Sequence, residues 1–400
     1  MHLHILGMGP IGCLLAHHIR QILPASHIIS LIHKTHSHRL DFLRRGSIEV
    51  EHAGTITSQE NFLHEDFMES PKLPPHPTSI PYLSPSLRTP IDSLVVAIKA
   101  QHTLNAIASL APRLSPNSTI VLMQNGMGIY ERLLNEVFRN PTQRPHFIMA
   151  SNTHGAFLTE PYRVHHAGLG SIEFGIPPDR GRDYEAGLYD PELPVEERRL
   201  RLSDIARPTD PDFTEYKSLR ETIAVLLLTK SLNISWIPFS EMDLAMKRKV
   251  VVNAVLNPLT SIMGCKNGDL FNHQSACDIL EQVCREASSV FAAQHRSDID
   301  QRIRDLEERG VDTTEIKIPR FSNSLSGESL KKDVLQVASL TQGNISSMLQ
   351  DIRRGRTTEI EYINGYLETL GRQLDVKTAA ISMLRTLVEL KSVLPEESTL

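Results

Sequence analysis

One stretch of the sequence places a lysine and two asparagines on the same face of a predicted helix. The segment 247–265 reads KRKVVVNAVLNPLTSIMGC, and three of its polar residues recur at intervals of four: Lys249, Asn253 and Asn257. This spacing is typical of one helix face, and the apolar neighbours on every side indicate a buried helix. Burial lowers the pKa of a lysine ammonium and suits it to act as a general acid. Asparagines bonded to loop backbone are the alternative interpretation, and Pro258 is expected to kink or end the helix.

A second polar cluster lies nearer the C-terminus. The sequence NISSMLQD begins at Asn344, and TTEIEYING begins at Thr357. Ser346 or Ser347 can cap a helix at this point, and Glu359 can be an acid in the first turn of the next helix. On the residues alone, capping is favoured over a role in binding.

A glycine motif opens the chain. It reads Gly7, Met8, Gly9, Pro10, Ile11, Gly12, and it follows a predicted strand and begins a predicted helix. In that context Gly7 permits a tight turn, Gly9 lets the backbone approach a pyrophosphate, and Gly12 lets the helix pack against the strand. Free N–H groups at the helix N-terminus then attract the phosphates. The motif predicts a dinucleotide site.

The end of the second predicted strand indicates which nucleotide binds. An NAD site usually has an acid there for the ribose 2′-hydroxyl, whereas this strand ends in His33 and Lys34, with Arg39 close behind and no acid before Asp41. A basic cluster fits a 2′-phosphate, so we expect NADP(H). An ordinary solvated basic turn is the alternative, and the sequence does not say which base makes the contact.

Two further residues follow strands of the same predicted sheet. Lys99 comes after the apolar run 94–98, and Asn125 comes after the run 119–123. Ligands of open parallel sheets bind at the carboxyl ends of the strands. We therefore expect both residues at the cofactor edge of the sheet, although either residue alone could belong to an ordinary loop.

The elements that position these residues fall into two classes. Apolar strands rich in Val and Ile alternate with helices in the first half, which predicts a parallel sheet covered on both faces. Helical periodicity dominates after about residue 215. We expect an NADP-binding domain at 1–210 and a helical substrate domain at 211–400. Charged or proline-rich stretches near 52–90 and 177–211 are expected to be surface insertions without a packed face.

The composition excludes several classes of function. A net charge of −5 provides no basic field for nucleic acid or an anionic membrane, and no apolar run of about 18 residues is present. The four cysteines lack regular spacing, so we expect free thiols and no metal site. A strand at the very start leaves no room for a leader, which predicts a cytoplasmic protein; association with mitochondria is the alternative. The expected partners are a small-molecule 2-keto acid and a second copy in a homodimer.

The motifs taken together resemble the ketopantoate reductase family, in its long fungal form. The resemblance rests on segments in family order: GMGPIG at 7–12, IKAQHT at 98–103, QNGMG at 124–128, THG at 153–155, HAG at 166–168, KVVVNAVLNPLTSIMGCKNGDL at 249–270 and NISSMLQDIRRGRTTEIEYINGYL at 344–367. The last two are long and specific. The resemblance implies an α/β Rossmann-type N-terminal domain and an all-α C-terminal domain of the 6-phosphogluconate dehydrogenase type, with the active site in the cleft between them.

The resemblance also implies the reaction and the roles of residues. It implies that NADPH reduces 2-dehydropantoate to (R)-pantoate in pantothenate biosynthesis, with Lys249 as the catalytic acid and Glu359 beside the cofactor and substrate. The substrate-binding residues that it implies are Asn253, Asn257, Asn267 and Ser347, and it places Lys99 and Asn125 at the cofactor. Bacterial members carry arginine in place of His33, which passes the 2′-phosphate contact to Lys34 or Arg39. A reductase of other 2-keto acids and a non-catalytic NADP-binding regulator are the alternatives.

Overall fold

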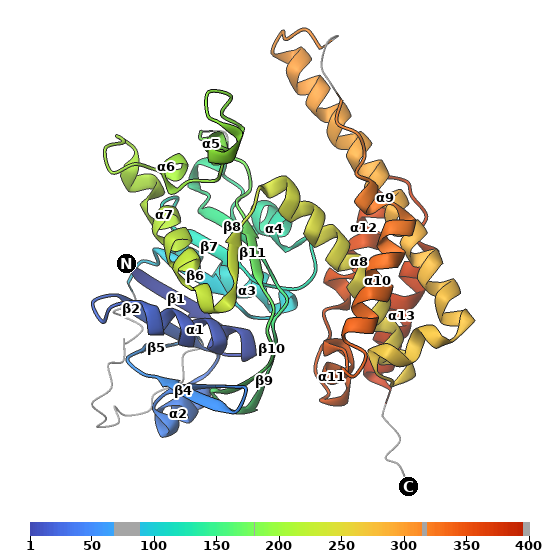
Figure 1. Ribbon diagram of the computed structural model, residues 1–400, viewed down its shortest axis with the longest axis horizontal. Helices are drawn as coiled ribbons and strands as arrows, with labels where there is room; N and C mark the ends of the chain where they lie inside the picture. The colour runs from blue at the N-terminus through green and yellow to red at the C-terminus, as the bar shows by residue number, and fades with distance from the viewer. Residues whose placement is uncertain (68–88, 180, 314–317, 395–400) are drawn as a thin grey trace. The chain divides into compact units, whose positions relative to one another are not determined.

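The computed structural model describes residues 1–67, 89–179, 181–313 and 318–394 (Figure 1). These residues form two compact units. The first unit comprises Met1–Gln124 and Ile129–Met242, and the second comprises Asn125–Gly128 and the chain from Asp243 onwards.

An eight-stranded sheet is the centre of the first unit. Its strands are β1 (His2–Leu6), β2 (Ile28–His33), β5 (Leu63–Asp66), β6 (Ser93–Val96), β7 (Thr119–Leu122), β8 (His146–Asn152), β11 (Ile172–Gly175) and β12 (Ile234–Trp236). They lie in the order β12-β11-β8-β7-β6-β1-β2-β5, and all neighbours are parallel except β8 and β11. The predicted parallel sheet is confirmed.

The central strands are buried because helices pack on the sheet. Ile5, Leu31 and Val121 have no exposed surface, as expected for apolar runs covered on both faces. The helices of this unit are α1 (Pro10–Ile22), α2 (His36–Arg45), α3 (Ala100–Leu110), α4 (Ile129–Arg132), α5 (Ala186–Tyr189), α6 (Leu202–Ile205) and α7 (Phe213–Leu228). Leu14 and Ile19 of α1 belong to the same apolar core.

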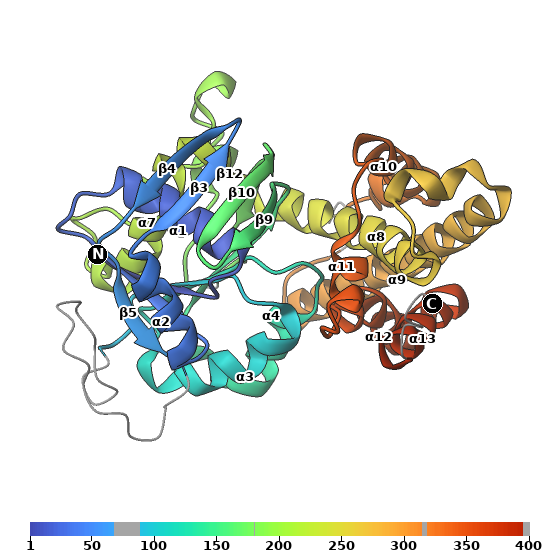
Figure 2. The same ribbon diagram turned by 90° about the horizontal axis from the view of Figure 1, so that it is seen from below.

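A second, four-stranded sheet was not predicted. It consists of β3 (Ile48–His52), β4 (Thr55–Gln59), β9 (Gly155–Glu160) and β10 (Arg163–Gly168), in the order β4-β3-β10-β9 (Figure 2). The insertion expected near 52–90 therefore begins with β4 and β5. The proline-rich stretch within it, apart from its last residues, lies outside the described residues.

The second expected insertion, at 177–211, contributes to the core, so the expectation that it lacks a packed face is wrong. Tyr184, Ile205 and Ala206 are buried in the core cluster of the first unit. Arg182 holds the segment together, because its guanidinium donates to the carbonyl of Ile205 at 2.6 Å and pairs with Asp210 at 3.0 Å.

The division between the units lies at residue 242, not near 210. Helix α7, expected in the second domain, belongs to the first because its polar side chains bond to the sheet. Thr222 shares a 2.7 Å hydrogen bond with Ser93, and Ser218 shares one of 2.7 Å with Thr119.

The second unit is helical throughout its described residues, as expected. It is built from α8 (Phe239–Met263), α9 (Gln274–Glu308), α10 (Gly327–Leu340), α11 (Ser347–Arg353), α12 (Asn364–Gln373) and α13 (Ala379–Val393), with short turns of helix η7 (Asn267–Asn272) and η9 (Ile360–Tyr362). Helix α8 starts in the first unit and continues through Pro258 to Met263, so the helix does not end at Pro258, although an end was one of the two outcomes expected there. None of the described helices is long and apolar enough to cross a membrane.

Candidate active site

Lys249 lies on α8, in a part of the helix that is otherwise apolar. Val250, Val251 and Val255 beside it are buried, which confirms the buried helix expected from the sequence. The Lys249 side chain keeps some solvent-accessible surface. Loss of hydration nevertheless lowers its pKa from 10.5 to about 8, and the negative charge of Glu359 partly opposes that decrease. The lysine is therefore an acid whose pKa lies near neutral pH.

Asn253 and Asn257 continue the polar face of α8. Asn257 is 9% exposed and Asn253 is half-buried. Within the described parts of the chain neither side chain makes a hydrogen bond, and neither has an amide atom fully shut off from solvent. The alternative interpretation, in which loop backbone forms hydrogen bonds with these amides, is therefore wrong for the described residues. Both amides remain available to a ligand.

Contacts at the end of α8 bring Asn267 and the NISS segment to it. Thr260 Oγ1 of α8 donates to Ser346 Oγ at 2.7 Å, and Asn267 N donates to the Asn344 carbonyl at 3.1 Å. Asn267 Nδ2 donates to Thr341 Oγ1 at 2.9 Å. Its Oδ1 is buried and accepts no hydrogen bond from any described residue. A donor on a ligand would satisfy this acceptor.

The two serines of the NISS segment lie in different environments. Ser346 is the N-cap of α11, and its Oγ accepts a hydrogen bond from Leu349 N at 3.2 Å. Ser347 is the first residue of α11 and is exposed. The cap interpretation therefore applies to Ser346 and leaves the Ser347 hydroxyl outside the cap. Glu359 precedes η9 without a side-chain capping bond, so capping does not account for it either.

The loop that contains Asn125 belongs to the second unit, although the sequence placed it at the cofactor edge of the first. Gly126 has a φ of +83°, and a Cβ there would lie 2.3 Å from the Tyr362 carbonyl. That carbonyl accepts a hydrogen bond from Met127 N at 2.9 Å. The close approach requires glycine and holds the Asn125–Gly128 loop against the residues that follow Glu359.

The glycine motif of the first unit has the geometry that the sequence predicted. Gly7 has a φ of +104°, and a Cβ on Gly12 would lie 1.8 Å from the Gly7 carbonyl oxygen. Gly9 is different, because a Cβ there would meet nothing within 4 Å. As the N-cap of α1, Gly9 offers no side-chain bond to the first turn. The free N–H groups of that turn and the space at Gly9 fit a pyrophosphate.

The structure corrects the expected role of His33. The ring is 1% exposed, and its two nitrogens are hydrogen-bonded to Tyr162 Oη at 2.9 Å and His64 Nδ1 at 3.0 Å. Burial and the neighbouring His64 lower its pKa to about 3. An uncharged ring in the core cannot neutralise a phosphate, so His33 is not the group that contacts it.

Of the remaining bases, Lys34 is the one left exposed. Arg39 pairs with Asp66 at 3.1 Å, an acid that β5 brings beside the end of β2 and that sequence reasoning missed. Lys34 is exposed and makes no ion pair among the described residues. Burial lowers the pKa of His102, and the charges of Lys34 and then Lys99 lower it further. Lys34 and Lys99 therefore contribute to one positive region at the carboxyl ends of the strands.

One group of metal-ligating side chains occurs among the described residues. His2, His4 and Glu65 have ligand atoms within 4.8 Å of one another. Arg113 lies in the same cluster, with its guanidinium 2.7 Å from Glu65 and 3.4 Å from His4 Nε2. The positive charge beside this carboxylate is thus supplied by an arginine.

Comparison with known proteins identifies the family. The family model described as "Ketopantoate reductase PanE/ApbA" matches residues 3–179, and its C-terminal counterpart matches residues 241–392. The chain is 26% identical to "Probable 2-dehydropantoate 2-reductase" of Schizosaccharomyces pombe, over 92% of this chain and 90% of that protein. It is 31% identical to the Escherichia coli O157:H7 2-dehydropantoate 2-reductase, over 69% of this chain and 66% of that protein.

A solved structure has the same fold. D-mandelate dehydrogenase, determined with NADH and anilino(oxo)acetate, superposes with a TM-score of 0.65 at 17% identity and covers 98% of each chain. The resemblance drawn from the glycine motif, the α8 segment and the NISS segment is therefore confirmed, and the chain belongs to the ketopantoate reductase family.

Proposed function

We propose that this chain reduces 2-dehydropantoate to (R)-pantoate with NADPH, a step of pantothenate biosynthesis. The observation that carries the proposal is the face of α8. Lys249, with a pKa lowered to about 8, precedes two asparagines whose side-chain amides have no hydrogen-bond partner among the described residues. A small keto acid needs this combination of one proton donor and several fixed hydrogen-bonding groups. Membership of the ketopantoate reductase family indicates that this keto acid is 2-dehydropantoate.

The first unit would hold the cofactor. The N–H groups in the first turn of α1 and the space at Gly9 would receive its pyrophosphate. Lys34, exposed beside Lys99 and His102, would pair with the 2′-phosphate. When bound, NADPH supplies the hydride, which is the part of the reaction that no side chain of the protein can perform.

The second unit would hold the substrate and control one proton. Lys249 Nζ would donate a hydrogen bond to the ketone oxygen and transfer a proton to it as it becomes an alkoxide. Glu359 would keep the lysine protonated at neutral pH, since its charge raises the Lys249 pKa. The amides of Asn253 and Asn257 would bind the substrate hydroxyl and carbonyl groups. Ser347 would bind the carboxylate, and Asn267 Oδ1 would accept from the hydroxyl.

The experiment that tests the proposal is NADPH oxidation by the purified protein with 2-dehydropantoate and, in parallel, with a panel of other 2-keto acids. We expect the highest kcat/KM for 2-dehydropantoate. Lys249→Ala should lower kcat at least about 100-fold, because general acid catalysis contributes that much, while NADPH binding stays unchanged. Lys247→Ala is the matched control, since Lys247 lies two residues away and pairs with Asp243 at 2.7 Å.

Each outcome of this experiment decides something. Turnover of another keto acid with a higher kcat/KM would replace the substrate and keep the mechanism. NADPH binding without oxidation of any keto acid would overturn the proposal in favour of a non-catalytic regulator. Equal loss in the Lys247 and Lys249 variants would remove the assignment of the acid.

Two expectations about the whole protein stay predictions. We infer that the chain forms a homodimer, and light scattering after size exclusion measures its mass in solution. We also expect the cytoplasm as its location, which fractionation of its own cells tests against the mitochondrial alternative.

A further inference from the structure

Helix α8 contains a proline at a point where the helix should lose a hydrogen bond. Pro258 has no N–H, and in an α-helix that group would donate to the carbonyl four residues earlier, at Ala254. Both residues are buried, so water does not replace the donor. A buried carbonyl without a partner destabilises the helix, and prolines in helices commonly end or kink them. Nevertheless α8 continues to Met263.

Asn364 supplies the missing donor. It is the first residue of α12 and has no exposed surface. Its Nδ2 donates to the Ala254 carbonyl at 3.2 Å and to the Ile381 carbonyl of α13 at 3.3 Å. The two N–H groups of the amide meet two acceptors, which fixes its orientation, because a flipped amide would place Oδ1 against both carbonyls.

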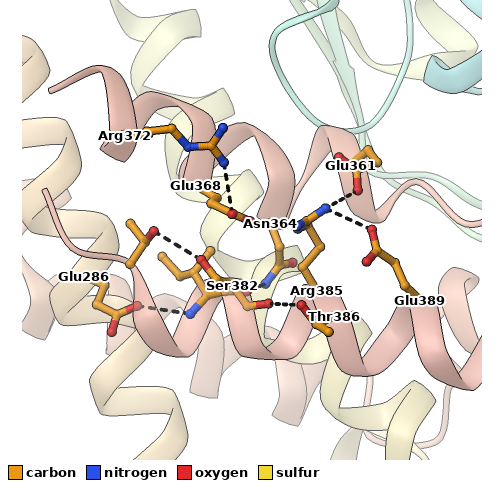
Figure 3. Close-up of polar contacts among 11 residues, drawn as sticks. Glu286, Glu361, Asn364, Glu368, Arg372, Ser382, Arg385, Thr386 and Glu389 are labelled. Atoms are coloured by element: carbon orange, nitrogen blue, oxygen red, sulfur yellow. Dashed lines mark hydrogen bonds and ion pairs between the residues drawn. The ribbon is translucent and has the colours of Figure 1, made fainter. Parts of the chain in front are cut away.

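The helix α13 that shares this amide is itself anchored. Glu286 of α9 accepts hydrogen bonds from Ala380 N and Ile381 N, each at 3.0 Å, at the first turn of α13 (Figure 3). These orphan N–H groups and the helix dipole favour a carboxylate there. Asn364 therefore connects α8 to a helix end that is held in place from a third helix.

The position of Ala254 gives the contact a consequence for the active site. Ala254 follows Asn253 directly and lies three residues before Asn257. We propose that Asn364 is a positioning residue, which keeps α8 helical past Pro258 so that Asn253 and Asn257 stay on the same face as Lys249. The role rests on the proposed function, because it concerns the substrate amides of that site. Asn364 itself does not contact the substrate.

A double-mutant cycle tests this role, because an alanine at position 258 restores the N–H that Asn364 replaces. The variants are Asn364→Ala, Asn364→Leu, Pro258→Ala and the two double variants that combine Pro258→Ala with each change at 364. Thr386→Ala is the control, since its exposed hydroxyl on α13 donates to the Ser382 carbonyl of its own helix, at 3.0 Å.

We expect Asn364→Ala and Asn364→Leu to lower kcat/KM for the keto acid at least about tenfold and to leave the Kd for NADPH within about twofold. Amide hydrogen exchange across α8 from residue 253 to 262 should become faster in these variants. Pro258→Ala alone should change little. In the double variants, kcat/KM and the exchange rates should return to within about threefold of the Pro258→Ala values.

A role of Asn364 in packing alone predicts a different result, because Pro258→Ala would then rescue nothing. Double variants as impaired as the single Asn364 variants would overturn the proposal, and so would full activity in Asn364→Ala. Should the single variants fail to fold, a folded and active double variant supports the proposal and an unfolded one refutes it. Hydrogen exchange needs no substrate, so the test of Asn364 stays separate even where wild-type protein proves inactive with 2-dehydropantoate.

Discussion

The lowered pKa of Lys249 predicts how the reaction rate depends on pH. A general acid must carry its proton when the substrate binds, so kcat/KM should fall as pH rises through the pKa of the free enzyme. Burial brings that pKa from 10.5 to about 8. This decrease in the pKa corresponds to a penalty of roughly 3 kcal/mol on the charged ammonium.

The size of the decrease follows from this pKa. With a pKa of about 8, about 90% of Lys249 is protonated at pH 7 and about 10% at pH 9. We therefore expect kcat/KM for 2-dehydropantoate to fall about tenfold between these two pH values. A lysine with its ordinary pKa would lose only a few per cent of its protons over the same range, so the two cases are easily distinguished.

The assay is NADPH oxidation at saturating NADPH, from pH 6 to pH 10, with kcat/KM fitted at each pH. Glu359→Gln removes the charge that raises the Lys249 pKa, so the midpoint of the decrease should move to lower pH. Glu361→Gln is the matched control, because that carboxylate lies two residues away and pairs with Arg385 at 2.8 Å (Figure 3). A rate that does not change up to pH 10, or a midpoint that rises in Glu359→Gln, would refute the reasoning.

Three further predictions concern the first unit. Gly9→Ala should fold with an unchanged Tm, because its Cβ enters open space, but it should weaken NADPH binding at least about tenfold, because that space would receive the pyrophosphate. Gly12→Ala should unfold the unit, because its Cβ would lie 1.8 Å from a carbonyl oxygen. Thermal melts and titration with NADPH distinguish the two variants, and stable NADPH binding by Gly12→Ala would contradict the packing argument. Lys34→Glu should raise the KM for NADPH more than that for NADH, with the exposed Lys230 changed to Glu as control; equal effects on both cofactors would exclude Lys34 from the 2′-phosphate site. His33 has a folded pKa of about 3 and an unfolded one near 6.5, so the stability that its neutral ring contributes is complete above pH 6.5 and is lost as pH falls. The free energy of unfolding in urea should decrease from pH 7 to pH 5, and about 2 kcal/mol of that decrease should come from His33 and disappear in His33→Gln; an equal decrease in the wild type and in His33→Gln would contradict the reasoning.

The strands of the large sheet and the glycine loop could be predicted because their causes are local. An apolar run such as 94–98 indicates a buried strand wherever it lies in the chain, and Gly7 and Gly12 each meet a steric demand within six residues. The second sheet has no comparable signal. Residues 55–59 of β4 are polar apart from Ile56 and largely exposed. Strand β3 pairs with β10 from a distant part of the sequence.

The misplaced residues share one physical reason, since each depends on a partner that is remote in the sequence. His33 is polar and follows an apolar strand, so the sequence allowed it to face a ligand. Tyr162 and His64 instead provide partners for both ring nitrogens, which makes burial of the ring acceptable. Helix α7 is likewise expected in the second domain, because the partners of its Thr222 and Ser218 side chains, Ser93 and Thr119, lie about a hundred residues earlier in the chain.

At the candidate site, the conformation around Pro258 likewise depends on a partner that is remote in the sequence, and this affects the chemistry. The sequence gives a reason for α8 to end at this proline and contains no local feature that keeps it helical. The donor comes instead from Asn364, at the start of another helix. Because Asn253 and Asn257 lie on either side of the carbonyl that Asn364 binds, their alignment with Lys249 depends on a side chain that has no exposed surface. A substitution at position 364 should therefore impair substrate binding while the pKa-dependent decrease of kcat/KM at alkaline pH persists, which separates the positioning of the amides from the acidity of the lysine.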